Sequence, residues 1–337
     1  MKRLKIAITM GDPAGIGPEI IAKMYLNYDL YKVADVFVIG DLFPMLSAQR
    51  RISSKLSIRP MSSFSKLSRV KNTINLMDMK ALALKDFSIG EATATQGKAS
   101  FEYIKTAIKL AVDGDIDAIV TAPITKYALH MAGVKYPGHT EMLSSFTKTK
   151  KYAMLLMSDK LKVVLATIHT GIKNVPGKLT PKGIFDLLVL TDKALRKDFG
   201  ISKPSIAVCG LNPHAGEAGA FGNEEIKIIK PAIAKAVKAG INAQGPYSGD
   251  TIFQKVIHSK SHDAVVAMYH DQGLIPLKLL SFETGVNVTL GLPIVRTSPD
   301  HGTAYDIAGT AKASEKSIYA AFKTAIEIVK NRKRKIE

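Results

Sequence analysis

Three histidines each follow a short apolar run, and their type and position predict metal binding. They are His169, His214 and His270. The apolar runs span residues 162–168, 205–213 and 264–269. Runs of this length that are rich in β-branched residues predict strands buried on both faces, as in a parallel sheet, and ligands bind beyond the carboxyl ends of such strands. Three imidazoles with one open position describe a catalytic site for zinc or a similar ion; the alternative is three unrelated loop histidines.

A second group of polar residues has the chemistry to bind an anionic substrate. His139 and Thr140 follow a Pro-Gly turn, where an imidazole could donate to a phosphate or carboxylate or transfer a proton. Alternatively, Thr140 caps a helix and His139 is solvated. Lys278, Asn287 and Arg296 interrupt stretches that are otherwise apolar or rich in Gly and Pro. Lysine and arginine suit a phosphate, so near a metal site these residues would form an anion clamp.

Two glycine-containing loops are candidates for binding a nucleotide or anion. Residues 11–19 lie between a predicted strand and a helix expected to begin at Pro18, a junction whose backbone amides can bind an anion. This loop lacks the G-x-G-x-x-G order, and a tight βα turn accounts for its glycines equally well. Residues 301–309 combine small residues with a carboxylate that could accept from ribose hydroxyls; the alternative is an irregular surface loop. The candidate cofactor-binding residues there are His301, Gly302 and Asp306.

The elements that must position these residues alternate between strands and helices, which predicts an α/β fold. Residues 4–9, 36–39 and 118–121 are expected to be strands. Apolar residues recur at spacings of three and four over 101–111 and 318–329, as in a helix with one apolar face. Breaks near residues 130 and 300 fit one discontinuous domain from residues 1–130 and 301–337, with residues 131–300 as the second.

The length and net charge of the chain limit the classes of protein to which it can belong. The chain has 337 residues, 46% of them hydrophobic, which suffices for one large or two medium domains. The net charge of +18 suggests nucleic-acid binding as a remote alternative, but no zinc-finger, helix-turn-helix or aromatic-basic RNA motif accompanies it. A single cysteine, Cys209, suits a reducing compartment, and no segment is long and apolar enough for a signal peptide or a membrane span. We therefore expect a cytoplasmic protein that binds neither nucleic acid nor membrane.

Taken together, the motifs closely resemble the 4-hydroxythreonine-4-phosphate dehydrogenase (PdxA) family. They stand in the family's order between residue 6 and about residue 310. The matching segments are residues 11–19, 121–123, 138–141, 212–217, 269–273 and 297–303.

The resemblance implies the two-domain α/β fold of isocitrate and isopropylmalate dehydrogenases, with a cleft between the domains. Residues 1–130 and 301–337 would then form the cofactor side, and residues 131–300 would hold the metal, the substrate and the dimer contact. Those enzymes bind NAD or NADP without the usual glycine fingerprint, and residues 301–309 resemble their adenine-side loop. It also implies a homodimer whose active site is shared, so that one metal ligand comes from the partner subunit. The metal ligands would be His169, His214 and His270. The substrate residues would be His139, Thr140, Lys278, Asn287 and Arg296.

The implied reaction belongs to the biosynthesis of pyridoxal 5′-phosphate (vitamin B6). 4-Phosphooxy-L-threonine would be oxidised to 2-amino-3-oxo-4-phosphooxybutanoate, a β-keto acid that loses carbon dioxide to give 3-amino-2-oxopropyl phosphate. Zinc, magnesium, manganese and cobalt all remain open as the metal, and so does the choice of NAD or NADP. The candidates for the base are Asp250, Asp271 and His139. The nearest alternative is a sister enzyme that oxidises a threonate or erythronate 4-phosphate or a dihydrodiol carboxylate.

Overall fold

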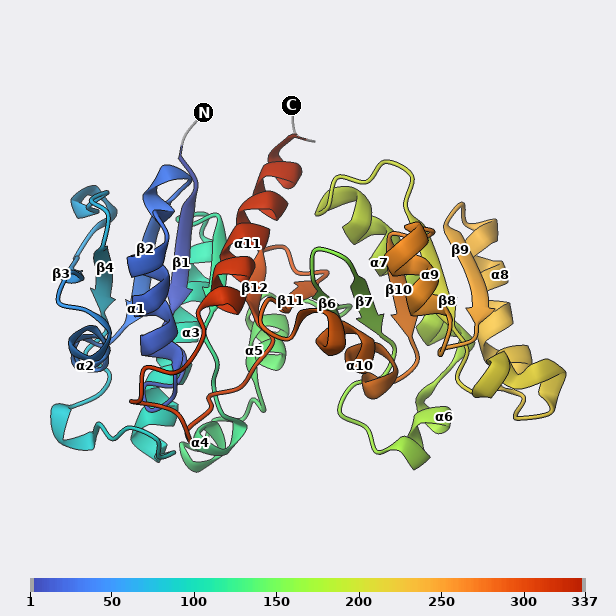
Figure 1. Cartoon of the computed structure of the whole chain (residues 1–337), viewed down its shortest axis with the longest axis horizontal. Helices are drawn as coiled ribbons and strands as arrows, with labels where there is room; N and C mark the ends of the chain where they lie inside the picture. The colour runs from blue at the N-terminus through green and yellow to red at the C-terminus, as the bar shows by residue number, and fades with distance from the viewer. Residues whose placement is uncertain (1–2, 335–337) are drawn as a thin grey trace. The chain divides into compact units, whose positions relative to one another are not determined.

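The chain forms two compact α/β units, and the computed structural model describes residues 3–334 of them (Figure 1). Unit 1 comprises Met1–Lys150 and Leu292–Val329, and unit 2 comprises Lys151–Gly291 and Lys330–Glu337. The domain prediction has the same discontinuous form but assigns residues 131–150 and 292–300 to the second domain and residues 330–337 to the first. The domain prediction stays a prediction.

Unit 1 is built on six parallel strands in the order β3-β4-β2-β1-β5-β12. The strands are β1 (Lys5–Thr9), β2 (Asp35–Gly40), β3 (Ser57–Pro60), β4 (Thr73–Asp78), β5 (Ala118–Thr121) and β12 (Arg296–Pro299). Every residue of β2, β5 and β12 is buried, as expected of parallel strands covered on both faces. The last strand in the sequence therefore completes a sheet that begins at the N-terminus.

Helices cover the sheet of unit 1. They are α1 (Gly17–Asn27), α2 (Leu42–Ile52), α3 (Ala94–Val112), α4 (Lys126–Met131), α5 (His139–Phe146) and α11 (Lys316–Arg334). The hydroxyl of Thr93 caps α3 by accepting from the backbone N–H of Gln96, and α3 packs on β1, β2 and β5. Helix α11 buries Ile318, Phe322 and Ala325, the periodic face predicted from the sequence.

Unit 2 contains a mixed sheet in the order β11-β6-β7-β10-β8-β9. The strands are β6 (Ala153–Met157), β7 (Lys162–Leu165), β8 (Ser205–Cys209), β9 (Asn242–Tyr247), β10 (Ala264–Ala267) and β11 (Val286–Leu290). Strands β7, β10, β8 and β9 run parallel, whereas β6 is antiparallel to both of its neighbours. The parallel arrangement brings the carboxyl ends of β7, β10 and β8 to one edge of the sheet.

One apolar core packs two helices of unit 2 against its sheet. The helices of unit 2 are α6 (Val175–Lys178), α7 (Pro181–Lys197), α8 (Lys230–Lys238), α9 (Ile252–Ser259) and α10 (His270–Ser281). Side chains of α9 and α10 pack with those of β7, β8 and β10 in a single cluster, where Phe253, Leu274 and Leu277 are buried. Cys209 lies in the same cluster, and burial raises the pKa of its thiol to about 12, so it acts as a packing residue.

The α/β prediction and the predicted strands are confirmed. Strand β5 has the predicted bounds, β1 begins one residue later than predicted, and β2 extends one residue further at each end. The three apolar runs that precede histidines contain β7, β8 and β10. Within the described part of the chain, no helix is both long and apolar enough to span a bilayer.

Candidate active site

Two of the three strand-end histidines are neighbours. His169 lies four residues beyond β7 with a positive φ of 42°, and His270 is the first residue of α10, three residues beyond β10. Because β7 and β10 pair in parallel, both histidines leave the sheet at the same edge. Their ring centroids are 5.9 Å apart. The structure therefore brings His169 and His270 together, as the strand-end positions predicted.

The third histidine lies on a left-handed turn after β8. Residues 214–218 all have positive φ, between 39° and 80°, and His214 is the first of them. The exposed His214 imidazole lines a pocket of about 520 Å³ in unit 2. Among residues 3–334, no three His, Cys, Asp or Glu side chains form a group that could hold a metal ion. The assignment of all three histidines to one ion stays a prediction.

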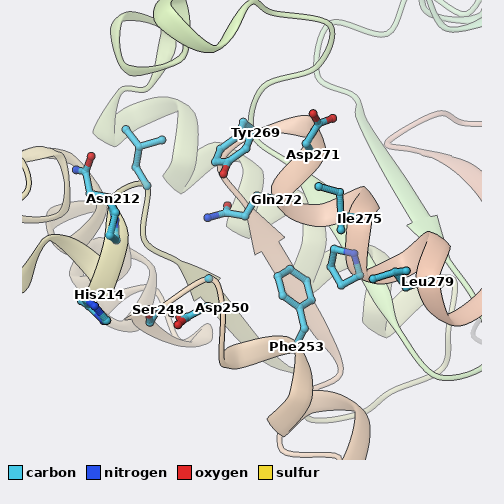
Figure 2. A pocket seen from close by; sticks show the side chains of 14 residues that line it. Asn212, His214, Ser248, Asp250, Phe253, Tyr269, Asp271, Gln272, Ile275 and Leu279 are labelled. Atoms are coloured by element: carbon cyan, nitrogen blue, oxygen red, sulfur yellow. Dashed lines mark hydrogen bonds between the residues drawn. The ribbon is translucent and has the colours of Figure 1, made fainter.

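The pocket also contains both carboxylates predicted as catalytic. Figure 2 shows His214, Ser248 and Asp250 side by side, with Asp271 on another wall. The Ser248 hydroxyl donates to Asp250 at 2.5 Å. This hydrogen bond is the main cause that lowers the pKa of Asp250, and the nearby His214 adds a smaller contribution. Asp271 is joined to the His270 imidazole, with 2.7 Å between Oδ1 and Nδ1.

The other predicted residues of unit 2 lie on α10 and β11. Lys278 is exposed on α10, eight residues after His270, and does not line the pocket. Asn287 lies on β11, and its buried Oδ1 atom has no hydrogen-bond partner among the described residues. A buried amide oxygen without a partner costs free energy, which a ligand donating to that atom would recover.

Unit 1 contains a buried cation beside an imidazole. Arg296 is the first residue of β12 and is 3% exposed, and its Nε and Nη2 donate to the Thr121 hydroxyl at 3.1 and 2.7 Å. Burial lowers the pKa of Arg296 to about 9, which leaves it charged at pH 7. His139, the first residue of α5, has a buried Nε2 with no hydrogen-bond partner within residues 3–334. Burial and, secondarily, the charge of Arg296 hold the pKa of His139 well below 6.5.

The structure thus keeps His139 neutral next to a desolvated guanidinium. A neutral imidazole with a free buried nitrogen can donate to an anion without adding a second charge. Thr140 follows as the second residue of α5, and the residue that caps this helix is Gly138, so Thr140 does not serve as the N-cap. The alternative interpretation of Thr140 as a helix cap was wrong.

Residues 301–309 pack against the N-terminal loop of the same unit. The Thr303 carbonyl accepts from the backbone N–H of Ile16 at 3.0 Å, and the Tyr305 hydroxyl donates to buried Asp12 at 2.6 Å. His301 has a buried Nε2 without a hydrogen-bond partner in the described chain, whereas Gly302 and Asp306 are exposed. Burial also lowers the pKa of His301. These contacts fix the conformation of the predicted cofactor loop.

The glycines of residues 11–19 serve a close backbone approach. A Cβ at Gly11 would lie 2.3 Å from the Pro123 carbonyl oxygen, and one at Gly17 would lie 2.2 Å from that of Met10. The tight-turn interpretation of this loop therefore has direct structural support. Asp12 accepts from the backbone N–H of Ala14 at 3.0 Å, and burial raises the pKa of its carboxyl. Sequence reasoning did not find Tyr305 as its partner, because the two residues are 293 positions apart.

Comparisons with known proteins identify one family over most of the chain. A family model described as pyridoxal phosphate biosynthetic protein PdxA matches residues 32–325. A 4-hydroxythreonine-4-phosphate dehydrogenase of Desulfosudis oleivorans is 47% identical over 323 residues, covering 96% of this chain and 95% of the relative. A D-threonate 4-phosphate dehydrogenase of Salmonella typhimurium is 43% identical over 329 residues, covering 97% and 100%.

A solved structure extends the comparison to the fold. The crystal structure of 4-hydroxythreonine-4-phosphate dehydrogenase from Klebsiella pneumoniae superimposes with a TM-score of 0.89 at 43% identity. It covers 98% of each chain. The resemblance expected from the sequence is thereby confirmed across almost the whole length. The chain belongs to the PdxA family of dehydrogenases.

Proposed function

We propose that the protein oxidises 4-phosphooxy-L-threonine with NAD or NADP in the biosynthesis of pyridoxal 5′-phosphate. The observation that carries the proposal is the buried Arg296 beside neutral His139, within a chain of this family. A buried guanidinium has lost much of its hydration, so an anionic group that reaches it gains more than it would at an exposed arginine. The substrate has two anionic groups, a phosphate and a carboxylate.

In this proposal, His139 and Arg296 bind one anionic group of the substrate. Arg296 is held by Thr121, so its planar fork has a fixed direction before the ligand arrives. The unpartnered Nε2 of His139 donates the additional hydrogen bond, and Thr140 and Asn287 offer a hydroxyl and a buried amide oxygen to polar atoms of the ligand. Lys278 contributes a further positive charge from α10.

The proposed metal ligands are His169, His214 and His270, whose donor chemistry fits a divalent ion. His169 and His270 already lie 5.9 Å apart between ring centroids, and the Asp271 carboxylate contacts His270 Nδ1 and so orients the ring, leaving Nε2 for the ion. Zinc, cobalt, manganese and magnesium are all compatible with the proposal, and imidazole ligands favour the softer ions.

The remaining chemistry is proton transfer and loss of carbon dioxide. When bound, the nicotinamide supplies the hydride acceptor, and the divalent ion supplies Lewis-acid stabilisation of negative charge on the substrate oxygen. Asp250 lines the pocket and is the proposed base that takes the proton of the substrate hydroxyl, while the hydride leaves the carbon that carries this hydroxyl. The product is a β-keto acid, which takes up a proton and releases carbon dioxide to give 3-amino-2-oxopropyl phosphate. His301, Gly302 and Asp306 are the proposed cofactor contacts.

We also propose that the protein acts as a homodimer that shares its active site. Helix α10 and its C-cap residue expose Ile275, Leu279 and Phe282, whose exposed fractions are 59%, 83% and 77%. This helix begins at His270, a proposed metal ligand. Large apolar side chains with such high exposure are typical of a protein–protein interface, so we propose that a second subunit covers them. Light scattering tests the dimer, and a monomer at micromolar concentration would contradict it.

A sister activity on D-threonate 4-phosphate is the second candidate. Relatives named for the two activities have similar sequence identity to this chain. The 4-hydroxythreonine-4-phosphate dehydrogenase is 47% identical, and the D-threonate 4-phosphate dehydrogenase is 43% identical. The two substrates differ in the group on the carbon next to the carboxylate, an ammonium in one and a hydroxyl in the other. Membership of a dehydrogenase family argues against the remote alternative of a nucleic-acid-binding protein.

One assay tests both candidates. Formation of NADH or NADPH would be followed with 4-phospho-L-threonine and with 4-phospho-D-threonate, each with and without a chelator. We expect chelator-sensitive turnover of the threonine derivative at a kcat/KM at least tenfold above that of the threonate. The reverse preference would move the protein to the sister activity, and turnover that a chelator leaves unchanged would contradict the proposed metal.

A further inference from the structure

The turn that carries His214 has an unusual conformation. Five consecutive residues, 214–218, have left-handed backbone angles, and four of them are not glycine. In a left-handed conformation the Cβ of a non-glycine residue lies too close to the following carbonyl oxygen, so the surrounding structure must stabilise the turn. The glycine at position 216 has a φ of 80°. Contacts outside the turn must therefore determine where His214 is held.

A buried carboxylate fills the inside of this loop. Glu225 is 1% exposed, and its Oε1 accepts from the backbone N–H groups of Leu211 and Asn212 at 2.7 and 2.8 Å. Its Oε2 accepts from the Asn212 side-chain amide at 2.9 Å. Burial alone would raise the pKa of Glu225, but the hydrogen bonds from Asn212 and Leu211 outweigh burial and lower it. Glu225 is therefore a buried, ionised acceptor for three N–H groups just before His214.

The loop is shaped around this carboxylate. A Cβ at Gly216 would lie 2.5 Å from Glu225 Oε2, and one at Gly210 would lie 2.8 Å from Ala215 Cα and 3.1 Å from Glu225 Oε1. The glycines on both sides of His214 therefore leave room for the carboxylate. Glu225 itself lies in a π-helical turn, Glu225–Ile229, that leads into α8. Such turns occur often at functional sites.

We propose that Glu225 is a positioning residue that holds the left-handed turn and so fixes the His214 imidazole at the wall of the pocket. Glu225 does not line the pocket. Glu225 acts through its hydrogen bonds to Leu211 and Asn212, which line the pocket. These two residues precede His214 by three and two positions. The inference rests on the proposed function in assigning His214 to the metal.

The adjacent Glu224 provides a matched control. Its Oε2 accepts from the Asn212 side chain at 2.8 Å. The backbone N–H groups of residues 211 and 212 donate to Glu225 instead. Glu225→Ala removes the acceptor of all three N–H groups. Glu225→Gln keeps the shape and one oxygen, so it is the milder variant and serves if Glu225→Ala does not fold.

The first measurement is Co²⁺ binding to the purified full chain, followed by titration and by the visible absorption of the bound ion. We expect Glu225→Ala to weaken Co²⁺ binding at least tenfold and to change the spectrum. Glu225→Gln should fall between Glu225→Ala and wild type, and Glu224→Ala should stay within twofold of wild type. Co²⁺ affinity within twofold of wild type in folded Glu225→Ala, or in Glu225→Gln if only that variant folds, would overturn the proposal.

The second measurement is hydrogen exchange of residues 210–219 without added metal. We expect exchange there to be at least tenfold faster in Glu225→Ala, whereas the peptides of β7 and β10 should be unchanged. If wild type binds no Co²⁺, the proposed metal site has failed, and hydrogen exchange alone decides the role of Glu225. Unchanged exchange in residues 210–219 would then overturn it.

Discussion

Gln272 donates its side-chain Nε2 to the carbonyl oxygen of Gly210 at 2.7 Å. Its Oε1 accepts from the backbone N–H of Met268 at 2.7 Å. One side chain therefore joins the end of β8, which leads to His214, to the end of β10, which leads to His270. Figure 2 shows Gln272 among the side chains that line the pocket, below Tyr269 in this view. The bridge lies just beyond the last paired residues of the two strands, Val208 and Val266, so it links the segments that lead to His214 and His270.

Replacing Gln272 by Ala should lower both the stability of the protein and its affinity for a metal ion. Two backbone groups lose their partners, at a cost of about 1–3 kcal/mol each where they remain unsatisfied, and water in the open pocket will reduce that loss. We expect the free energy of unfolding to fall by about 1–2 kcal/mol and Co²⁺ affinity to fall several-fold. Urea denaturation and Co²⁺ titration check this, with exposed Gln244→Ala as the control. Equal behaviour of the two variants would contradict the bridge.

His214→Ala should remove metal binding without unfolding the protein. His214 is exposed, so its loss changes the free energy of unfolding by no more than about 1 kcal/mol. We expect bound metal and turnover both to fall below a tenth of the wild-type values. Elemental analysis of the dialysed protein measures this, with His258→Ala, an exposed histidine of α9, as the control. Normal metal content in His214→Ala would exclude His214 from the ligand set.

Arg296→Lys should mainly raise KM. Lysine keeps the charge but loses the planar fork that Thr121 holds in place. An anion contact made equally in the ground and transition states affects binding more than the chemical step, so KM should rise about tenfold while kcat changes by less than about threefold. Steady-state kinetics, with exposed Arg59→Lys as the control, measure this. A wild-type KM would remove Arg296 from the substrate site.

The stability of the protein should depend on pH through His139. Its pKa in the folded protein is below the usual value of 6.5, so between these two pKa values the unfolded chain binds more protons than the folded one. The free energy of unfolding must therefore fall as pH drops below about 6.5, by at most about 1.4 kcal/mol per pH unit for this one group.

His139→Gln removes this contribution. We expect the variant to lose less stability than wild type between pH 7.5 and pH 5.5, when urea midpoints are measured without substrate. His130→Gln is the control, because it replaces an exposed histidine of α4 with the same residue. Parallel pH profiles for wild type and His139→Gln would show that His139 is not held neutral by the fold.

Local patterns were enough to predict these strands and the histidines that follow their carboxyl ends. The apolar runs before His169 and His270 are buried strands, and their parallel pairing brings the two rings together. The periodic apolar faces of α3 and α11 were equally clear, because period and burial coincide in a helix that covers a sheet.

The parts that could not be predicted depend on contacts between distant segments. Gln272 and Gly210 are 62 positions apart, and Asp12 and Tyr305 are 293 apart, so no local pattern identifies either pair. The left-handed turn at His214 is equally hidden, because four of its five residues are of types that rarely take positive φ. Glu225 belongs to no motif in the sequence, and only its three N–H partners in the structure mark its role.

The discontinuity of unit 1 has a consequence for the order in which the protein folds during synthesis. The described strands of unit 2 lie within residues 151–291, so they emerge from the ribosome before β12 and α11. The N-terminal segment must wait for β12 to pair with β5 and for α11 to complete its core. The segment made first is therefore finished last, and a nascent chain that has just released β11 would present the whole sheet of unit 2 attached to a unit 1 that still lacks its sixth strand.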